Sequence, residues 1–264
     1  MDLERDAQYR ELLLAPLRTS ASYLPKMGGG VEVDLAGFSA LYGADPLYHW
    51  IGFDSPLMFA AHKAAGGMTS LYRQLGIGSE RLIRQIFRDE LGLTEEQVRW
   101  SYSYEEDGRT RTLTLDGRLE ASEVSDPQAR DRLVRWIDAQ RAALGISVDL
   151  KGAIFEIRQG YKSADSKRQN ADLANAAQAL GYGYLPVLAV MSTQINNVVR
   201  TRYRVGRWCV LLGSLSTETP DAGVSTFDFI REVVGYDLVA FFERNAAELR
   251  ADVEQTLTQL LEAR

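Results

Sequence analysis

The sequence predicts an α/β protein in which helices flank a central mixed β-sheet, with a mainly helical region before the sheet and a helix after it. The 264 residues are 45% hydrophobic, which is enough to build a packed core. The apolar period changes from helical to two near residue 100, and strand-like and helix-like segments alternate after residue 145. Such an alternation is typical of a sheet with helices packed on its faces.

The N-terminal third of the chain has helical patterns. Residues 3–15 and 55–90 are expected to be helical, and the glycines of residues 27–30 predict a flexible break. Glycines at 66–67 and 76–78 are expected to interrupt the second helix, which should end before Gly92. We expect residues 1–98 to form a mainly helical region packed on a core of residues 99–264, the two making one continuous domain.

The elements of the sheet follow in order. Alternating aromatic residues at 100–104, a turn at 106–108 and renewed alternation at 110–115 predict a β-hairpin. An Asp-Pro pair begins a helix expected over 126–143. Strands are expected at 146–150, 153–158, 185–191 and 207–212, and helices at 164–180, 194–203 and 237–261, the last as one helix or a pair.

Composition excludes several classes of site. One cysteine and two histidines cannot supply the about four Cys/His ligands of a structural zinc site, and they make a histidine-rich nuclease centre improbable. A bound metal is therefore expected to be a hard ion held by carboxylates and water, with Mg²⁺ the natural candidate. The lone Cys209, an acidic start that does not resemble a signal peptide and the short apolar stretches predict a cytoplasmic protein without a membrane partner.

Charge is unevenly distributed along the chain. The net charge is −6, yet nine Lys/Arg and three Asp/Glu lie between Lys151 and Val210, a local charge of +6 that leaves −12 elsewhere. Such asymmetry suits a protein with one face toward phosphates, although a solvated surface with a fluctuation in charge also explains it.

A short acidic pattern suggests phosphodiester chemistry. Asp149 and Glu156 fall on two adjacent expected strands, and Arg158 shares a strand face with Glu156 while Ile157 faces the core. Hydrolysis assisted by Mg²⁺ needs converging acidic ligands and usually a cation beside them. We therefore expect Asp149 and Glu156 to bind the metal and Arg158 to act in catalysis. A surface ion pair is the competing explanation of the same residues.

The pattern resembles the PD-(D/E)xK nuclease motif, which implies a restriction-endonuclease-like core. Arg158 stands where that motif has Lys, and arginine stays protonated, so it cannot serve as a general base. Lys162 is expected to supply the missing amine, with Lys151 as an alternative. Glu80 is a candidate for a further helix carboxylate near the metal, although a plain surface role explains it as well.

Four blocks of sequence resemble the ApaLI-like type II restriction endonucleases. They are LYGADPLYHW (41–50), AAHKAAGGMTSLYRQLGIG (60–78), FEIRQGYKSADSKRQNAD (155–172) and REVVGYD (231–237). The resemblance implies double-stranded DNA as substrate, Mg²⁺ as cofactor and a homodimer that reads a palindrome, GTGCAC for the family's namesake. It also implies a cognate DNA methyltransferase in the same system.

Candidate DNA contacts are cations and amides near the acidic pattern and on the second helix. Lys167 and Arg168 begin a helix beside the carboxylates, where a helix N-terminus favours phosphate. Further candidates are Lys63, Gln194, Asn197 and Arg200, the two amides having side chains that can read bases. Solvated helix faces explain the same residues without DNA.

Three functions remain open on the sequence alone. The leading hypothesis is a site-specific endonuclease of a restriction system. A structure-specific or repair nuclease with the same fold is the second. The third is a DNA-binding module without catalysis, for which Arg158 in the place of Lys would be a sign of lost activity.

Overall fold

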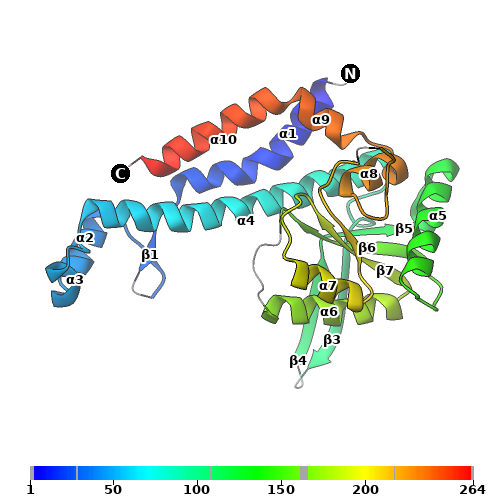
Figure 1. Cartoon of the computed structure of the whole chain (residues 1–264), viewed down its shortest axis with the longest axis horizontal. Helices are drawn as coiled ribbons and strands as arrows, with labels where there is room; N and C mark the ends of the chain where they lie inside the picture. The colour runs from blue at the N-terminus through cyan, green and yellow to red at the C-terminus, as the bar shows by residue number, and fades with distance from the viewer. Residues whose placement is uncertain (1–2, 28, 107–108, 161–165, 217, 263–264) are drawn as a thin grey trace. The chain divides into compact units, whose positions relative to one another are not determined.

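A computed structural model of the chain describes residues 3–27, 29–106, 109–160, 166–216 and 218–262, the side chains of 104–106, 109, 111, 113 and 166–171 excepted. The chain divides into two compact units (Figure 1): Met1–Gly78 with Arg244–Arg264, and Ser79–Glu243. This division differs from the one expected at residue 98. The C-terminal helix groups with the N-terminal unit and not with the sheet.

The first unit is mainly helical. Its elements are α1 (Leu3–Arg18), the short η1 (Thr19–Ser22), strands β1 (Lys26–Met27) and β2 (Val31–Glu32), α2 (Leu35–Gly43), α3 (Pro46–Trp50), the first part of α4 (Pro56–Leu91) and α10 (Ala246–Leu261). Leu14 and Leu17 of α1 and Leu71 of α4 pack with apolar residues of α10. This contact places the two ends of the sequence in one hydrophobic core.

Helix α4 is continuous, so the expected interruptions at its glycines are wrong. A Cβ at Gly67 would lie 2.6 Å from Leu260 Cδ1 of α10, and one at Gly78 would lie 2.2 Å from the Leu13 carbonyl oxygen of α1. Glycine costs a helix up to about 1 kcal/mol relative to alanine. These glycines allow α1 and α10 to approach α4 closely, and packing offsets their low propensity.

The second unit contains a four-stranded mixed sheet. Its strands run in the order β5 (Gly117–Glu120), β6 (Gly152–Arg158), β7 (Tyr184–Val190) and β8 (Cys209–Leu211). β5 is antiparallel to β6, whereas β6, β7 and β8 are parallel. The expected mixed sheet is confirmed, and the strands expected at 153–158, 185–191 and 207–212 correspond to β6, β7 and β8. Strand β5 was not predicted.

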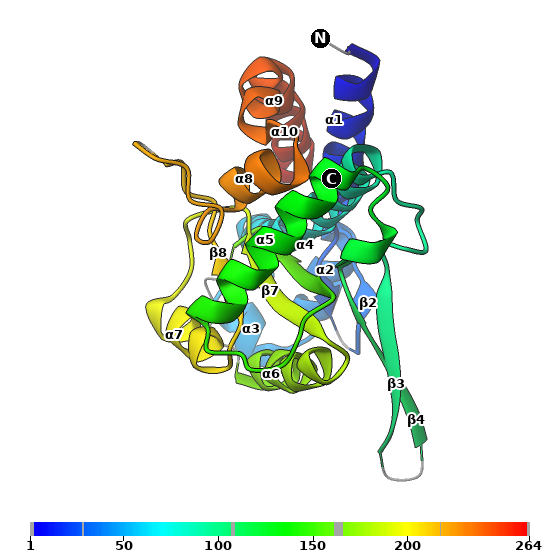
Figure 2. The ribbon, with the colours of Figure 1, turned by 90° about the vertical axis from the view of Figure 1, so that its right-hand side faces the viewer.

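Helices cover both faces of this sheet (Figures 1 and 2). On one face, α6 (Ser166–Gly181) and α7 (Asn197–Val205) pack on β6, β7 and β8 through two buried clusters that contain Ala179, Ile154 and Tyr203. On the other face, aromatic contacts join Phe155 of β6 to the end of α4, to α8 (Thr226–Phe229) and, through α8, to α5 (Pro127–Ala143). The remaining elements are η2 (Ala121–Glu123), η3 (Ile230–Val234) and α9 (Leu238–Arg244).

The predicted β-hairpin is confirmed. β3 (Trp100–Glu106) pairs antiparallel with β4 (Arg109–Leu115) in a two-stranded sheet of its own, which extends beyond the four-stranded sheet (Figure 2). Trp100 and Tyr102 are buried with Ile154 and Tyr184 at its base. Trp100 and Tyr102 therefore serve packing.

The strand expected at residues 146–150 is wrong, because the described chain is irregular there. Both edges of β6 are occupied, by β5 on one side and β7 on the other. Residues 146–150 therefore have no strand to pair with at the centre of the sheet. Only Ile146 of this segment is buried.

Among the described residues, no helix is both long enough and apolar enough to cross a membrane.

Candidate functional site

Two charged side chains lie together at the carboxyl end of β6. Glu156 is buried, and its carboxylate pairs with the guanidinium of Arg158. Side chains two residues apart on a strand share a face, and Ile157 between them is buried on the other face. The predicted placement of these three residues is confirmed.

Asp116 adds a second carboxylate from the neighbouring strand. It directly precedes β5, whose register with β6 pairs Gly117 with Phe155. Continued by one residue, this register sets Asp116 opposite Glu156. The Asp116 carboxylate accepts the main-chain N–H of Ile157 at 2.8 Å. The contact with Ile157 therefore places Asp116, and not Asp149, beside the part of β6 that carries Glu156.

The pKa of the Asp116 carboxyl is shifted by its surroundings. Its pKa is raised to about 6, chiefly because the carboxyl is buried and further because Glu80 is charged nearby. The Ile157 N–H and the charges of Arg158 and Arg84 act in the opposite direction. Glu80 lies on α4, with its carboxylate 2.6 Å from Arg84 Nη2. Glu80 of α4 and the two arginines thus act on Asp116 from different elements, and a carboxyl perturbed in this way is a candidate for a functional role.

A second acid–hydroxyl pair lies beside Arg158. The Arg158 Nη2 is 3.9 Å from a carboxylate oxygen of Asp172 on α6. Tyr203 of α7 donates its hydroxyl to the same carboxylate, and both Asp172 and Tyr203 are buried. Arg158 therefore lies between two buried acids, and Tyr203 fixes one of them.

Asp149 is not part of this group, which corrects the expected first acid. Its side chain is 97% exposed and pairs with Arg141 at 3.0 Å. It precedes β6, whereas Glu156 lies four residues into that strand, a rise of roughly 13 Å at about 3.3 Å per residue. Asp149 does not face Glu156 because residues 146–150 form no strand beside β6.

The expected lysines have different outcomes. Lys63 is 5% exposed, and its ammonium donates to the Glu262 carbonyl at 2.7 Å, so the structure does not present it on the surface, and its role in DNA binding stays a prediction. Lys151 lies before the opposite end of β6, 3.7 Å from Glu120. Lys162 lies outside the described residues. Lys167 and Arg168 are in the first turn of α6, and their side chains are likewise outside what is described.

The remaining candidates follow the carboxyl end of β7. Gln194 is exposed before α7, and Asn197 is exposed as the first residue of that helix. A Cβ at Gly160, just past β6, would lie 3.4 Å from the Gln194 carbonyl oxygen, so the segments after β6 and β7 are neighbours. Arg200 is half-buried, and its Nε has no hydrogen-bond partner among the described residues. These amides therefore lie along the same edge of the sheet as Glu156.

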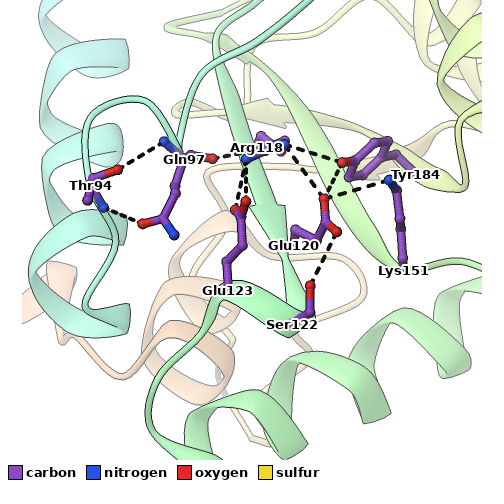
Figure 3. Close-up of polar contacts among 8 residues, drawn as sticks. All are labelled: Thr94, Gln97, Arg118, Glu120, Ser122, Glu123, Lys151 and Tyr184. Carbon is purple, nitrogen blue, oxygen red and sulfur yellow. Dashed lines mark hydrogen bonds and ion pairs between the residues drawn. The ribbon is translucent and has the colours of Figure 1, made fainter.

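The opposite end of the sheet has a separate polar network (Figure 3). Arg118 contacts the carboxylates of Glu120 and Glu123, and the Tyr184 hydroxyl donates to Glu120. Lys151 lies 4.7 Å from the centre of the Tyr184 ring. Gly152 and Tyr184 pair where β6 and β7 begin, so this network lies four residues along β6 from Glu156. It links β5, β6 and β7 by ion pairs and hydrogen bonds.

Asp116 and Glu156 provide the oxygen ligands that Mg²⁺ prefers. No three His, Cys, Asp or Glu side chains within the described ranges are placed to hold a metal ion by themselves. Mg²⁺ is usually held by one or two carboxylates, with water and substrate phosphate completing its shell. The chemistry of the donor set therefore fits Mg²⁺ held partly by substrate, but not a closed protein cage.

The sequence around Asp116 indicates a functional position, although the apolar periods used to predict strands do not point to it. The residue stands in Leu115-Asp116-Gly117, at the end of the alternating hairpin strand and before a glycine. An acid that terminates a strand lies at a sheet edge, where ligands bind. The four-residue β5 is too short for its pattern to predict a strand, whereas residues 146–150 have a strand-like pattern without forming one.

Comparisons with protein-family models, with curated proteins and with solved structures find no significant match to this chain. The site is therefore interpreted from its own chemistry.

Proposed function

We propose that the chain is a Mg²⁺-dependent endonuclease that hydrolyses double-stranded DNA, with Asp116 and Glu156 as its metal ligands. The observation that carries the proposal is the hydrogen bond from Ile157 of β6 to the Asp116 carboxylate, one residue from Glu156, whose own carboxylate pairs with Arg158. The raised pKa of Asp116 and the nearby charge of Glu80 support it, because crowded carboxylates favour a bound cation.

Each residue has a distinct task. A bound Mg²⁺ would polarise the scissile phosphate and make an attacking hydroxide available near neutral pH. Asp116 and Glu156 hold the cation, and Glu80 adds negative charge from α4. Arg158, always protonated, leaves Glu156 for a phosphate oxygen and neutralises charge that develops there. Asp172, fixed by Tyr203, keeps Arg158 within reach of the phosphate.

The charge distribution supports a nucleic acid as the substrate. The segment with a local charge of +6 contains β6, α6, β7 and α7, the elements that surround the acids. Arg204 and Arg207 on or just after α7 are exposed. Cations along one edge would position phosphates, while Gln194 and Asn197 are free to contact base edges. In its more specific form, the proposal is that the chain is a restriction endonuclease that recognises a palindromic sequence.

Digestion of a sequenced supercoiled plasmid tests the proposal. With Mg²⁺ we expect discrete bands whose ends map to one short sequence, and with EDTA no cutting. Glu156→Gln should abolish cutting while gel-shift binding to the same DNA stays within about threefold. Smearing, or cutting only at branched DNA, would instead indicate a structure-specific nuclease. Wild-type cutting by Glu156→Gln would exclude Glu156 as a ligand.

A DNA-binding module without catalysis is the second candidate. It is favoured by the Glu156–Arg158 pair, because an arginine that remains on Glu156 would compete with a cation. Tight, salt-sensitive DNA binding without cutting in Mg²⁺ or Mn²⁺ would establish this alternative.

A further inference from the structure

The helical unit contains a polar cavity of its own. Its volume is about 510 Å³, and its lining comes from η1 and the residues after it, from β1 and β2, and from the middle of α4. Figure 1 shows β1 beside α4. Sites for small ligands have volumes of roughly 300–1,000 Å³. The polar cavity is therefore large enough for a ligand of the size of a nucleotide.

The charges of the lining favour an anion. Among the described residues that line the cavity, Lys26 and Arg73 are cations and Glu32 is the one acid. The Lys26 ammonium is 3.5 Å from the Glu32 carboxylate, and both side chains are 58% exposed, so water screens this pair and holds it only weakly. Leu24 is the one aliphatic side chain of that lining, which excludes a mainly apolar ligand.

Several hydrogen-bond donors of the cavity are available to a ligand. The Tyr23 hydroxyl, the Arg73 guanidinium and the Gln74 amide make no hydrogen bond or ion pair to any described residue. The Thr19 and Thr69 hydroxyls, in contrast, donate to main-chain carbonyl oxygens at 2.6 and 3.2 Å. A ligand that fits must therefore bring acceptor oxygens for the first three groups.

Helix α4 places these groups on one face. Its lining residues are 66, 69, 70, 73 and 74, a spacing of three and four residues that keeps them on one side of a helix. A Cβ at Gly66 would lie 2.0 Å from the Tyr23 hydroxyl oxygen, so the glycine makes room for that hydroxyl against the helix. The segment 60–78, which contributes no residue to the acidic site of β6, thus forms one wall of the cavity.

We propose that the polar cavity binds the phosphate group of a phosphate ester. Arginine matches phosphate with two parallel N–H donors, and lysine adds a point charge. A phosphate group has three strong acceptor oxygens, which suits two cations together with the neutral donors of Tyr23 and Gln74. The cavity is much larger than a phosphate ion, so the ester has an organic part. A free nucleotide and the DNA backbone both supply this chemistry.

Titration of the full chain with inorganic phosphate tests the site. Mg²⁺ is left out so that the acids of β6 hold no cation, and sodium chloride of equal ionic strength is the reference. We expect saturable binding by calorimetry and a rise of a few degrees in Tm once phosphate is well above its Kd. Arg73→Gln should weaken binding at least tenfold, and Tyr23→Phe by about threefold.

The matched control is Arg250→Gln. Arg250 is an exposed arginine of α10 in the same unit, and it does not line the cavity, so this variant should keep the wild-type Kd for phosphate. Unchanged circular dichroism confirms that the variants are folded. Binding no stronger than in the chloride reference overturns the proposal, and so does an equal Kd in Arg73→Gln and the wild type.

Two further measurements identify the source of the phosphate. If it is the DNA backbone, Arg73→Gln should reduce the salt slope of binding to a short duplex by about 0.9, and Arg250→Gln should not. If it is a free nucleotide, the slope should stay unchanged and adenosine 5′-monophosphate should bind at least tenfold more tightly than inorganic phosphate. If neither holds, the phosphate-ester proposal is overturned.

The site does not depend on the nuclease proposal, and the two can fail separately. Phosphate binding by a chain that never cuts DNA would leave the cavity site standing and end the nuclease proposal. Cutting by a chain that does not bind phosphate in this cavity would have the opposite meaning.

Discussion

The Asp116 carboxylate accepts the main-chain N–H of Ile157 at 2.8 Å, which connects an acid at the edge of β5 to the strand that carries Glu156 and Arg158. This bond fixes the Asp116 side chain and, by favouring its charged form, opposes the burial that raises its pKa. The same contact therefore orients the carboxylate and keeps it available near neutral pH.

Asp116→Asn should lose cleavage by at least a hundredfold and yet gain stability. The amide oxygen still accepts the Ile157 N–H, whereas the buried charge is gone. A pKa near 6 corresponds to roughly 2–3 kcal/mol of unfavourable ionisation, so Tm should rise by a few degrees at pH 7. Asp149→Asn, at an exposed position, is the control and should cut at the wild-type rate. If Asp149→Asn is inactive, Asp149 is a metal ligand, as the sequence pattern predicts.

Mg²⁺ affinity should depend on pH in a defined range. The folded pKa of Asp116 is raised, so its protonated form stabilises the fold below the unfolded value, and that stability is lost as pH rises through about 6. Mg²⁺ needs the carboxylate, so affinity should fall about tenfold per pH unit below that value. Calorimetric titration between pH 4.5 and 7.5 measures this slope. It should flatten in Asp116→Asn, and an equal slope in both proteins would assign the titration to another group.

Arg158 should contribute to catalysis and compete with the metal. Arg158→Ala is expected to slow cleavage by on the order of a hundredfold. Its Mg²⁺ affinity should rise, because Glu156 no longer has a competing cation. Arg158→Lys should keep measurable activity, and Tyr203→Phe should lower the rate without changing affinity. If Arg158→Ala cuts normally while Lys162→Ala is inactive, the catalytic cation is Lys162.

Lys63→Ala should reduce stability and leave DNA binding unchanged. The ammonium is buried and donates to the Glu262 carbonyl, and loss of this hydrogen bond should cost about 0.5–1.5 kcal/mol. Chemical denaturation measures that cost. If Lys63 neutralised a phosphate, the salt slope of binding would decrease by about 0.9. An unchanged slope supports the structural role.

Tyr184→Phe should lower the stability of the protein and leave its cleavage activity unchanged. Although Glu120 is partly desolvated, the Tyr184 hydroxyl and the charge of Lys151 lower its pKa. A lowered pKa gives stability above the unfolded value that is lost as pH falls through the folded one. The variant should lose about 1 kcal/mol at pH 7 and less below pH 4, with cleavage unaffected. A loss of cleavage would connect this network to the site.

Most elements could be predicted because their periodicity is long and regular. The hairpin at 100–115, the helix after Asp126 and the buried β7 all have such patterns, and each is found. β5 has only four residues, and nothing within it distinguishes it from a loop. The common face of Glu156 and Arg158 could be predicted because both residues lie on one strand. The position of Asp116 could not, because it depends on a pairing with a strand more than thirty residues away.

The bond from Lys63 to the Glu262 carbonyl has a practical consequence for altered versions of the chain. A protein that ends at Leu261 would lack the acceptor for this buried ammonium, so its helical unit should be the first part to unfold on heating. An affinity tag joined after Arg264 keeps that acceptor. Removal of the last three residues would therefore take away the hydrogen-bond acceptor of a buried cation.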